Sequence, residues 1–397
     1  MKYWRGYLIA AIIGAITFVI NRLAATFSNL VDMVYPYLTR TVQTFLAQWS
    51  GGLDFCVWQV AAVVLLLLGL VSIVLMIVLR WNPIQWFGWI LTAAACLWFM
   101  HTCMYGLNYH AGSLAADIRL NVTEYTLEEL EAATTYYRDL ANGLADQVDR
   151  DGSGDVIYPE FEVLAHKAGK GFENLTYDYT YSVFAGSTAP VKKLGWSAMY
   201  TSMGITGVTM GMTGEAAVNP EIPAVSLPFT MCHEMSHRMC IAIERDANFG
   251  AFLASMAHPD KEFQYSAYFM AYRYCYSALY AQGSAEATTA AARIDSGVNA
   301  NFRHDLDEYS RFFNEKLDQK ANKMANSVND TYLKTSGDVG VASYDQVTDL
   351  LVSWHIQKVV LPSQQDEAES VFDPYDETQV DLSGIVNAKK PKNPEGG

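Results

Sequence analysis

Residues 231–248 read MCHEMSHRMCIAIERDAN, and this stretch decides how the soluble part of the chain is expected to fold. His233 and His237 are four residues apart, so at 3.6 residues per turn both imidazoles rise from one helix face and can bind one cation together. Glu234 lies beside them, where its carboxylate can take a proton from water. Imidazole and carboxylate ligands suit zinc, and a catalytic zinc site has three protein ligands with one position open.

The third ligand is expected downstream of the two histidines. On an unbroken helix Glu244 would share their face, but seven residues at ~1.5 Å per residue place it about 10 Å beyond His237. The chain must therefore bend between them. A second helix then carries Glu244 as the ligand and, one turn later, Asn248 as an amide that supports a ligand histidine. Asp246 is the competing third ligand.

The residues on both sides of the motif are apolar. They are Pro228, Phe229 and Met231 before it, and Met239, Ile241 and Ile243 after it. Two histidines and a glutamate that face a core would cost free energy without a partner such as a metal ion. The sequence therefore predicts a buried metal centre rather than a chance His-Glu-x-x-His on a solvated helix.

Three apolar runs lie near the N-terminus. Residues 57–79 read VWQVAAVVLLLLGLVSIVLMIVL without a charge, and a helix needs ~20 such residues to cross the hydrocarbon core of a bilayer. A second run covers residues 84–104. The first run, residues 7–27, is interpreted as a retained span, with a signal peptide as the alternative. Residues 28–52 between the first two spans indicate an external loop with a short amphipathic helix at the membrane surface.

Basic residues beside the spans set the expected orientation. With Lys2, Arg5 and Arg80 in the cytoplasm, everything after residue 105 lies outside it, by the positive-inside tendency. The expected division is a multi-pass membrane anchor over residues 1–105, an extracytoplasmic zinc metallopeptidase-like domain over residues 106–365 and a disordered tail over residues 366–397.

The soluble part alternates helical patterns with one turn-rich stretch. Thr126 opens a helix with a capping-box pattern that runs to about Val148. Residues 177–220, rich in Gly, Thr, Val and Tyr, indicate short strands, and residues 262–283 and 301–330 carry long helical runs. The predicted fold class is α+β and mostly helical, with N-terminal transmembrane helices followed by a zincin-like domain with a small sheet.

The formal net charge is -15. Binding to phosphates relies on clustered Lys and Arg, so this charge argues against nucleic acid as a partner. The expected partners are a peptide or protein substrate and the lipid bilayer. Beyond the apolar runs the chain has Cys232, Cys240 and Cys275, an odd number that gives no disulfide framework.

Residues 149–160, DRDGSGDVIYPE, contain a second ion-binding pattern. An EF-hand loop has oxygen ligands at fixed positions, with a glycine at the sharp turn, here Gly154. The ligands would be Asp149, Asp151, Ser153, the carbonyl of Asp155, and Glu160. Pro159 and the lack of a paired second hand favour the alternative, a solvated acidic turn. Calcium is therefore a second cofactor hypothesis beside zinc.

The chain resembles a bacterial family of uncharacterised membrane proteins with N-terminal spans and an external gluzincin-like domain. The resemblance covers most of the chain. The segments that carry it are Tyr35-Pro36, Gly106-Leu-Asn-Tyr, Pro223 to Asn248, Asn329-Asp-Thr-Tyr-Leu-Lys and Gly340-Val-Ala-Ser-Tyr-Asp. It implies a zinc metallopeptidase fold in which Glu244 and Asn248 match the acid and the Asp or Asn that follow the zinc helix of gluzincins. It implies no particular substrate.

Two positions depart from the family pattern. Cys240 stands where the family has a glycine three residues after the second histidine, so the expected bend lacks its easiest residue. Asp246 stands where a glutamate usually precedes Ala-Asn. Neither change removes an expected ligand.

The expected function is zinc-dependent hydrolysis of peptide bonds outside the cytoplasm, by a metalloendopeptidase of the gluzincin His-Glu-x-x-His type with Glu234 as general base. The alternative is a cell-surface sensor or scaffold in which the metal site is structural or inactive. A group that stabilises the oxyanion is also expected. The candidates for it are His258, Arg303, His304 and Tyr344.

Overall fold

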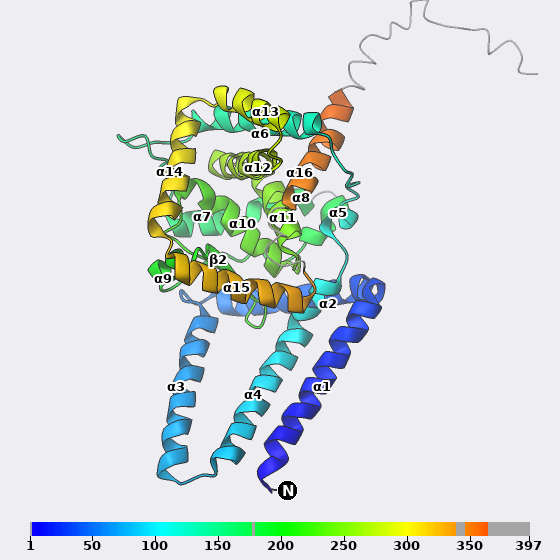
Figure 1. Ribbon diagram of the computed structural model, residues 1–397, viewed down its shortest axis with the longest axis vertical. Helices are drawn as coiled ribbons and strands as arrows, with labels where there is room; N and C mark the ends of the chain where they lie inside the picture. The colour runs from blue at the N-terminus through cyan, green and yellow to red at the C-terminus, as the bar shows by residue number, and fades with distance from the viewer. Residues whose placement is uncertain (1, 177–178, 339–345, 364–397) are drawn as a thin grey trace, which may run out of the picture. The chain divides into compact units, whose positions relative to one another are not determined.

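The computed structural model describes residues 2–176, 179–338 and 346–363 of the 397-residue chain. The described part is mostly helical with one small sheet (Figure 1), as the sequence predicts. The chain divides into two compact units, Met1–Ser353 and Trp354–Gly397. The predicted tail over residues 366–397 lies outside the described residues.

Three helices among the described residues are long and apolar enough to cross a membrane. They are α1 (Arg5–Thr26), α3 (Val57–Val78) and α4 (Pro83–Met104). Their bounds agree with the predicted spans to within two residues. α1 packs along α4, and a Cβ added to Gly6 would lie 2.5 Å from the backbone carbon of Gly88. The two glycines therefore permit the close backbone approach that membrane helices use for packing.

The segment between the first two spans forms one long helix, α2 (Ser28–Gly51), that lies across the ends of the spans nearest the soluble part (Figure 1). The prediction of a loop with a short helix is wrong. Pro36 is inside the helix, although a proline there removes a backbone hydrogen bond. Packing of the buried face of α2 on the rest of the protein holds the helix together.

The part of the chain after α4, called the soluble part from here on, is built mainly from helices. Those before the candidate metal motif are η2 (Gly106–His110), α5 (Leu114–Asp117), α6 (Leu127–Ala145), α7 (Phe161–Lys167), α8 (Gly169–Thr176), η3 (Tyr179–Phe184), α9 (Ser197–Met203) and η4 (Ala224–Ser226). Those that contain or follow it are α10 (Leu227–Arg238), α11 (Glu244–Met256), α12 (Lys261–Ala281), α13 (Ala285–Ser296), α14 (Ala300–Lys316), α15 (Gln319–Ser336), α16 (Val347–His355) and the π-helix η6 (Ile356–Val360).

Local signals explain two of these boundaries. The capping box predicted at Thr126 is present: its side chain accepts from the backbone N–H of Glu129, whose carboxylate accepts from the N–H of Thr126. The helical pattern predicted over residues 301–330 is confirmed and divides into two helices, α14 and α15. Asp318 caps the second of them by accepting from the backbone N–H groups of Lys320 and Ala321, because an aspartate before a helix satisfies its first free donors.

The sheet has three short strands in the order β1-β3-β2. β1 (Lys192–Lys193) pairs parallel to β3 (Glu215–Val218), and β2 (Gly207–Met210) pairs antiparallel to β3. Short strands are therefore present within residues 192–218, as predicted for the stretch 177–220. The expected strand at Tyr179–Phe184 is instead the 3-10 helix η3. β2 and β3 pack against α10, which places one edge strand beside the candidate metal motif.

Candidate metal centre

His233, His237 and Glu244 come together at the junction of α10 and α11. The Nε2 atoms of the two histidines are 3.1 Å apart, and Oε2 of Glu244 lies 3.4 Å from each of them. The three side chains are 10–12% exposed. Of the predicted ligands, the structure thus brings together both histidines and the preferred third residue.

These three atoms fit a zinc ion. Ligands at about 2.0–2.1 Å in tetrahedral geometry would be about 3.3 Å from one another, close to the distances found here. Oε2 of Glu244 is buried, and no described residue offers it a well-aligned hydrogen-bond donor. Two imidazole nitrogens and a carboxylate oxygen that converge in this way suit a cation in their midst.

The bend that brings Glu244 to the histidines occurs at residues 239–243. α10 ends at Arg238 and α11 begins at Glu244. Cys240 has φ 73°, a left-handed conformation that favours glycine. The Sγ atom of Cys240 accepts a hydrogen bond of 3.3 Å from the hydroxyl of Thr39. The expected bend is therefore present, and it places a cysteine in a glycine conformation.

A matched pair of substitutions at this bend tests the strain. Cys240→Gly should leave the folded protein as stable as the wild type or up to about 1 kcal/mol more stable, because the left-handed conformation costs an L-residue roughly 1–2 kcal/mol. Cys240→Val should destabilise it by about 1–3 kcal/mol, since a β-branched residue tolerates positive φ poorly. Thermal unfolding of the two variants is the measurement, and equal melting temperatures would contradict the assignment of strain.

A hydrogen bond orients the ring of His237, and neighbouring charges shift its pKa. Its Nδ1 lies 2.9 Å from the carbonyl oxygen of Ile241, so Nδ1 carries the proton and Nε2 presents a lone pair to the centre. Burial lowers the pKa of His237, but the carboxylates of Glu244 and Glu234 and the hydrogen bond to Ile241 together outweigh burial and raise the pKa to about 9. Burial raises the pKa of Glu244, yet the two histidines hold it well below its usual range. Without a cation, a proton would occupy this site.

Glu234 lies next to the ligands and faces strand β2. The hydroxyl of Thr209 is 2.7 Å from Oε2 of Glu234 and 2.8 Å from its backbone oxygen. A Cβ added to Gly207 would lie 2.6 Å from Cγ and 2.7 Å from Cδ of Glu234. Burial raises the pKa of Glu234, against the lowering effect of the two histidines. A carboxylate with a raised pKa is a better proton acceptor near neutral pH.

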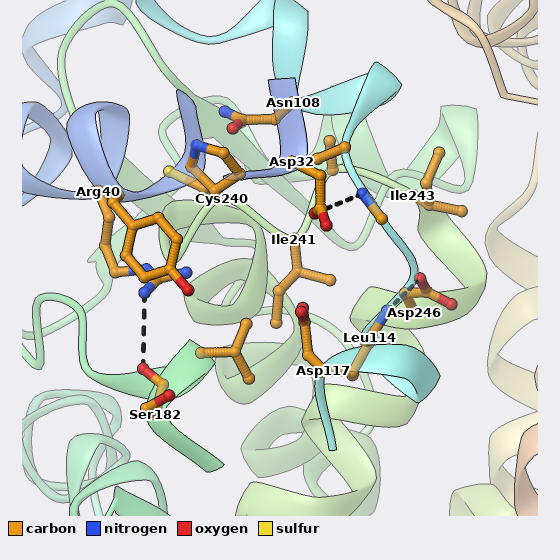
Figure 2. A pocket seen from close by; sticks show the side chains of 16 residues that line it. Asp32, Arg40, Asn108, Leu114, Asp117, Ser182, Cys240, Ile241, Ile243 and Asp246 are labelled. Atoms are coloured by element: carbon orange, nitrogen blue, oxygen red, sulfur yellow. Dashed lines mark hydrogen bonds between the residues drawn. The ribbon is translucent and has the colours of Figure 1, made fainter. Parts of the chain in front are cut away.

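Asp246 and Asn248 lie on α11 but away from the three converging atoms. Oδ2 of Asp246 accepts from the backbone N–H of Leu114, as Figure 2 shows, and Oδ1 is 3.0 Å from Nε of Arg245. Asp246 lines a cavity of about 110 Å³ behind the bend. Both oxygens of the Asp246 carboxylate therefore have other partners, and Glu244 is the candidate for the third ligand.

Asn248, which was expected to support a ligand histidine, contacts Tyr274 instead. Oδ1 of Asn248 accepts from the hydroxyl of Tyr274 at 3.2 Å. Within the described ranges, Nδ2 of Asn248 and Nδ1 of His233 are buried without hydrogen-bond partners. The structure thus shows no bond between this amide and a ligand histidine among the residues it describes.

Some residues near the centre were missed by sequence reasoning. Thr209 and Gly207 are among them, and so are three tyrosines whose pKa values are raised by burial and, in smaller part, by Glu244: Tyr105, Tyr109 and Tyr332. The hydroxyl of Tyr105 donates to the carbonyl oxygen of His237 at 3.0 Å. Tyr109 and Tyr332 lie in segments that carry the family resemblance. That resemblance is the sequence signal from which these two residues could have been found.

The predicted oxyanion-stabilising candidates have other partners. Nε2 of His258 lies 3.1 Å from the carbonyl oxygen of Lys167, and Arg303 pairs with Asp295. His304 pairs with Asp155 at 2.7 Å. Tyr344 lies outside the described residues.

The predicted calcium loop is closed by its own hydrogen bonds. Oδ1 of Asp151 accepts from the backbone N–H groups of Ser153 and Asp155, and the carbonyl of Asp155 accepts from the N–H of Asp151. The side chain of Asp155 instead groups with His304 and Glu308, with ligand atoms within 4.8 Å of one another. This group contains neither Asp149 nor Glu160, and calcium binding stays a prediction.

A family model matches the chain over residues 31–352, and its description is "Protein of unknown function (DUF3810)". The chain belongs to this family. No curated protein and no solved structure matches the chain. The DUF3810 match begins within α2 and ends in α16, so it contains the whole candidate metal centre. The resemblance to an uncharacterised family is confirmed, and the DUF3810 description assigns no activity.

Proposed function

We propose that this DUF3810 protein is a membrane-anchored zinc-dependent metallopeptidase that hydrolyses peptide bonds outside the cytoplasm. The observation that carries the proposal is the convergence of His233, His237 and Glu244, with the carboxylate of Glu234 beside them. The two histidines and Glu244 would hold the ion and leave one position open. A structural site would more commonly be closed by four protein ligands.

A zinc ion, when bound, supplies Lewis acidity toward a peptide carbonyl and toward water. The rest of the chemistry belongs to the chain. Glu234 accepts the proton of the attacking water and later gives it to the leaving amine. The hydroxyl of Thr209 holds the Glu234 carboxylate in place, and Ile241 fixes the ring orientation of His237. Glu234 is only 4% exposed, and this burial limits competing water around its carboxylate.

The arrangement of the spans supports an extracytoplasmic site. The N-terminus and the connection between α3 and α4 lie at one end of the membrane helices, and the soluble part lies at the other (Figure 1). The connection contains Arg80, and Lys2 and Arg5 lie at the N-terminus. All three basic residues therefore occupy the end opposite the metal centre, as the positive-inside tendency requires for a centre outside the cytoplasm.

Peptide hydrolysis by the purified full chain in detergent or nanodiscs tests the proposal. A mixture of quenched fluorescent peptides should be cleaved, a zinc chelator should stop cleavage, and added zinc should restore it. A sensor or scaffold with an inactive site would bind zinc and cleave none of the peptides. That result would overturn the proposed function.

Gly207→Ala tests the contact between β2 and the general base. The added Cβ would displace the side chain of Glu234, because it would lie 2.6 Å from Cγ. A displacement on the scale of 1 Å should lower kcat/KM by about 10- to 100-fold. Gly143→Ala is the matched control. A Cβ on Gly143, in α6, would lie within 4 Å of no atom of the described residues, so the kcat/KM of this variant should be unchanged. Equal kcat/KM for the two variants would contradict the role of Gly207.

A further inference from the structure

Helix α2 has two faces of opposite character. The exposed large apolar residues, between 52% and 69% exposed, are Leu30, Met33, Val34, Tyr37, Leu38, Phe45 and Trp49. At 100° per residue they fall within an arc of about 160°. The buried residues are Thr39, Arg40, Gln43, Ala47 and Ser50, and they occupy the opposite side. An exposed apolar stripe of this length marks an interaction surface.

The position of α2 in the chain identifies what covers this stripe. α1 ends at Thr26, two residues before α2 begins, and α3 begins at Val57, six residues after α2 ends. Both ends of α2 are thus tied to helices that enter the bilayer. α2 itself is not among the helices apolar enough to span a membrane. A helix with one apolar face and a polar opposite face, held at the ends of spans, fits the bilayer interface.

The buried face of α2 touches the walls of the candidate metal centre. Nε of Arg40 donates to the carbonyl oxygen of Met239 at 3.3 Å, and the hydroxyl of Thr39 donates to Sγ of Cys240. Figure 2 shows Arg40 and Cys240 together at the cavity behind the bend. α2 is therefore bonded directly to the bend between the two ligand-bearing helices.

A second contact ties α2 to the other side of the centre. Nε2 of Gln43 donates to the carbonyl oxygen of Gly211 at 2.7 Å. Gly211 follows strand β2, which carries Thr209 and Gly207 beside Glu234. The same helix thus supports both the ligands and the general base.

These contacts fix the height of the centre above the membrane. A helix with its side chains is about 10–12 Å across, so residues that contact the upper face of an interfacial helix lie about one helix diameter from lipid. An extended chain covers about 3.3 Å per residue. An extended segment of only about four residues therefore suffices to bring a peptide bond from a membrane anchor to this height.

We propose that α2 lies in the bilayer interface with its apolar face in lipid, and that it holds the centre at a height suited to membrane-proximal segments of bilayer-anchored proteins. This substrate class rests on the proposed peptidase function. It follows from where the centre is held, because anchoring enzyme and substrate in one membrane raises their effective concentration.

Photo-crosslinking tests the lipid contact independently of activity. p-Benzoylphenylalanine replaces Phe45 or Trp49 in the full chain in nanodiscs, and mass spectrometry detects the adducts. Lipid adducts are expected at both positions. The control position is Tyr280, an exposed aromatic residue at 74% exposure on α12, where no lipid adduct is expected. Adducts to a second copy of the chain, or no lipid adducts on α2, would overturn the proposal.

Cleavage of anchored substrates tests the substrate class. A sequence that the protein cleaves as a free peptide is fused to a transmembrane helix through linkers of about 5 or about 40 residues, and both are reconstituted with the protein. The short-linker substrate should be cleaved at least about tenfold faster than the free peptide and than the long-linker substrate. Equal rates would overturn this inference and leave the peptidase function standing. Failure to find any peptide that the protein cleaves, free or anchored, would overturn the function itself.

Discussion

Glu234→Gln should lower kcat for peptide cleavage by about 10²- to 10⁴-fold while the protein keeps its full zinc content. The substitution preserves the size of the side chain and its hydrogen bond with Thr209, so the fold and the three ligands should be retained. What it removes is the carboxylate that accepts the proton, and general base catalysis typically contributes this range of rate. Peptide cleavage and metal analysis on the same preparation measure both quantities.

Glu221→Gln provides the control for this prediction. Glu221 is an exposed residue before α10, and its substitution removes the same charge without touching the centre. Its kcat should equal that of the wild type. Undiminished cleavage by Glu234→Gln would refute the role of Glu234, and loss of zinc from that variant would show that the substitution damages the site instead.

Lys192→Met should destabilise the protein by about 3–5 kcal/mol, because it leaves the buried carboxylate of Glu215 without its counter-charge. Nζ of Lys192 lies 2.8 Å from Oε1 of Glu215, and the two side chains are 8% and 0% exposed. The same carboxylate accepts from the backbone N–H groups of Val57 and Trp58. It therefore joins the sheet to the first turn of α3, one of the three candidate membrane spans.

The neighbouring residue in β1 gives a matched control. Lys193 pairs with Glu162, and both side chains are largely exposed, at 46% and 61%. Lys193→Met should leave the melting temperature nearly unchanged, because exposed pairs are screened by solvent. Lys192→Met should lower it by at least about 5 °C. Equal melting temperatures for the two variants would show that the buried pair does not hold the sheet to α3.

The parts of the site that were predicted from the sequence depend on local geometry. His233 and His237 share a helix face because their spacing matches the helical repeat. Glu244 could be proposed because a bend was the only way to bring it back to them. The prediction of the three apolar helices also needs only local information, since length and composition alone identify a helix that can cross a bilayer.

The parts that were not predicted depend on contacts between distant segments. The bond of Thr209 with Glu234 joins a strand to a helix 25 residues away, and no short-range pattern encodes such a pairing. The full length of α2 was missed because Pro36 normally ends or bends a helix. The sequence alone leaves Asp246 as an alternative ligand, because only the fold shows that its carboxylate binds the backbone N–H of Leu114.

Cys240 illustrates a conflict between local preference and the tertiary fold. The sequence showed that the bend lacked a glycine, and left-handed backbone is costly for other residues. The structure nevertheless places φ 73° at Cys240. The contacts of the bend with α2 hold this conformation against its local cost.

The central claim is that two imidazoles and the Glu244 carboxylate bind one zinc ion together. X-ray absorption at the zinc edge of the purified full chain tests it most directly. We expect one zinc per chain with two histidine nitrogens and oxygen ligands at about 2.0–2.1 Å, and no bound zinc in His237→Ala. A wild-type protein without zinc, or zinc held by sulfur or retained unchanged in His237→Ala, would contradict it.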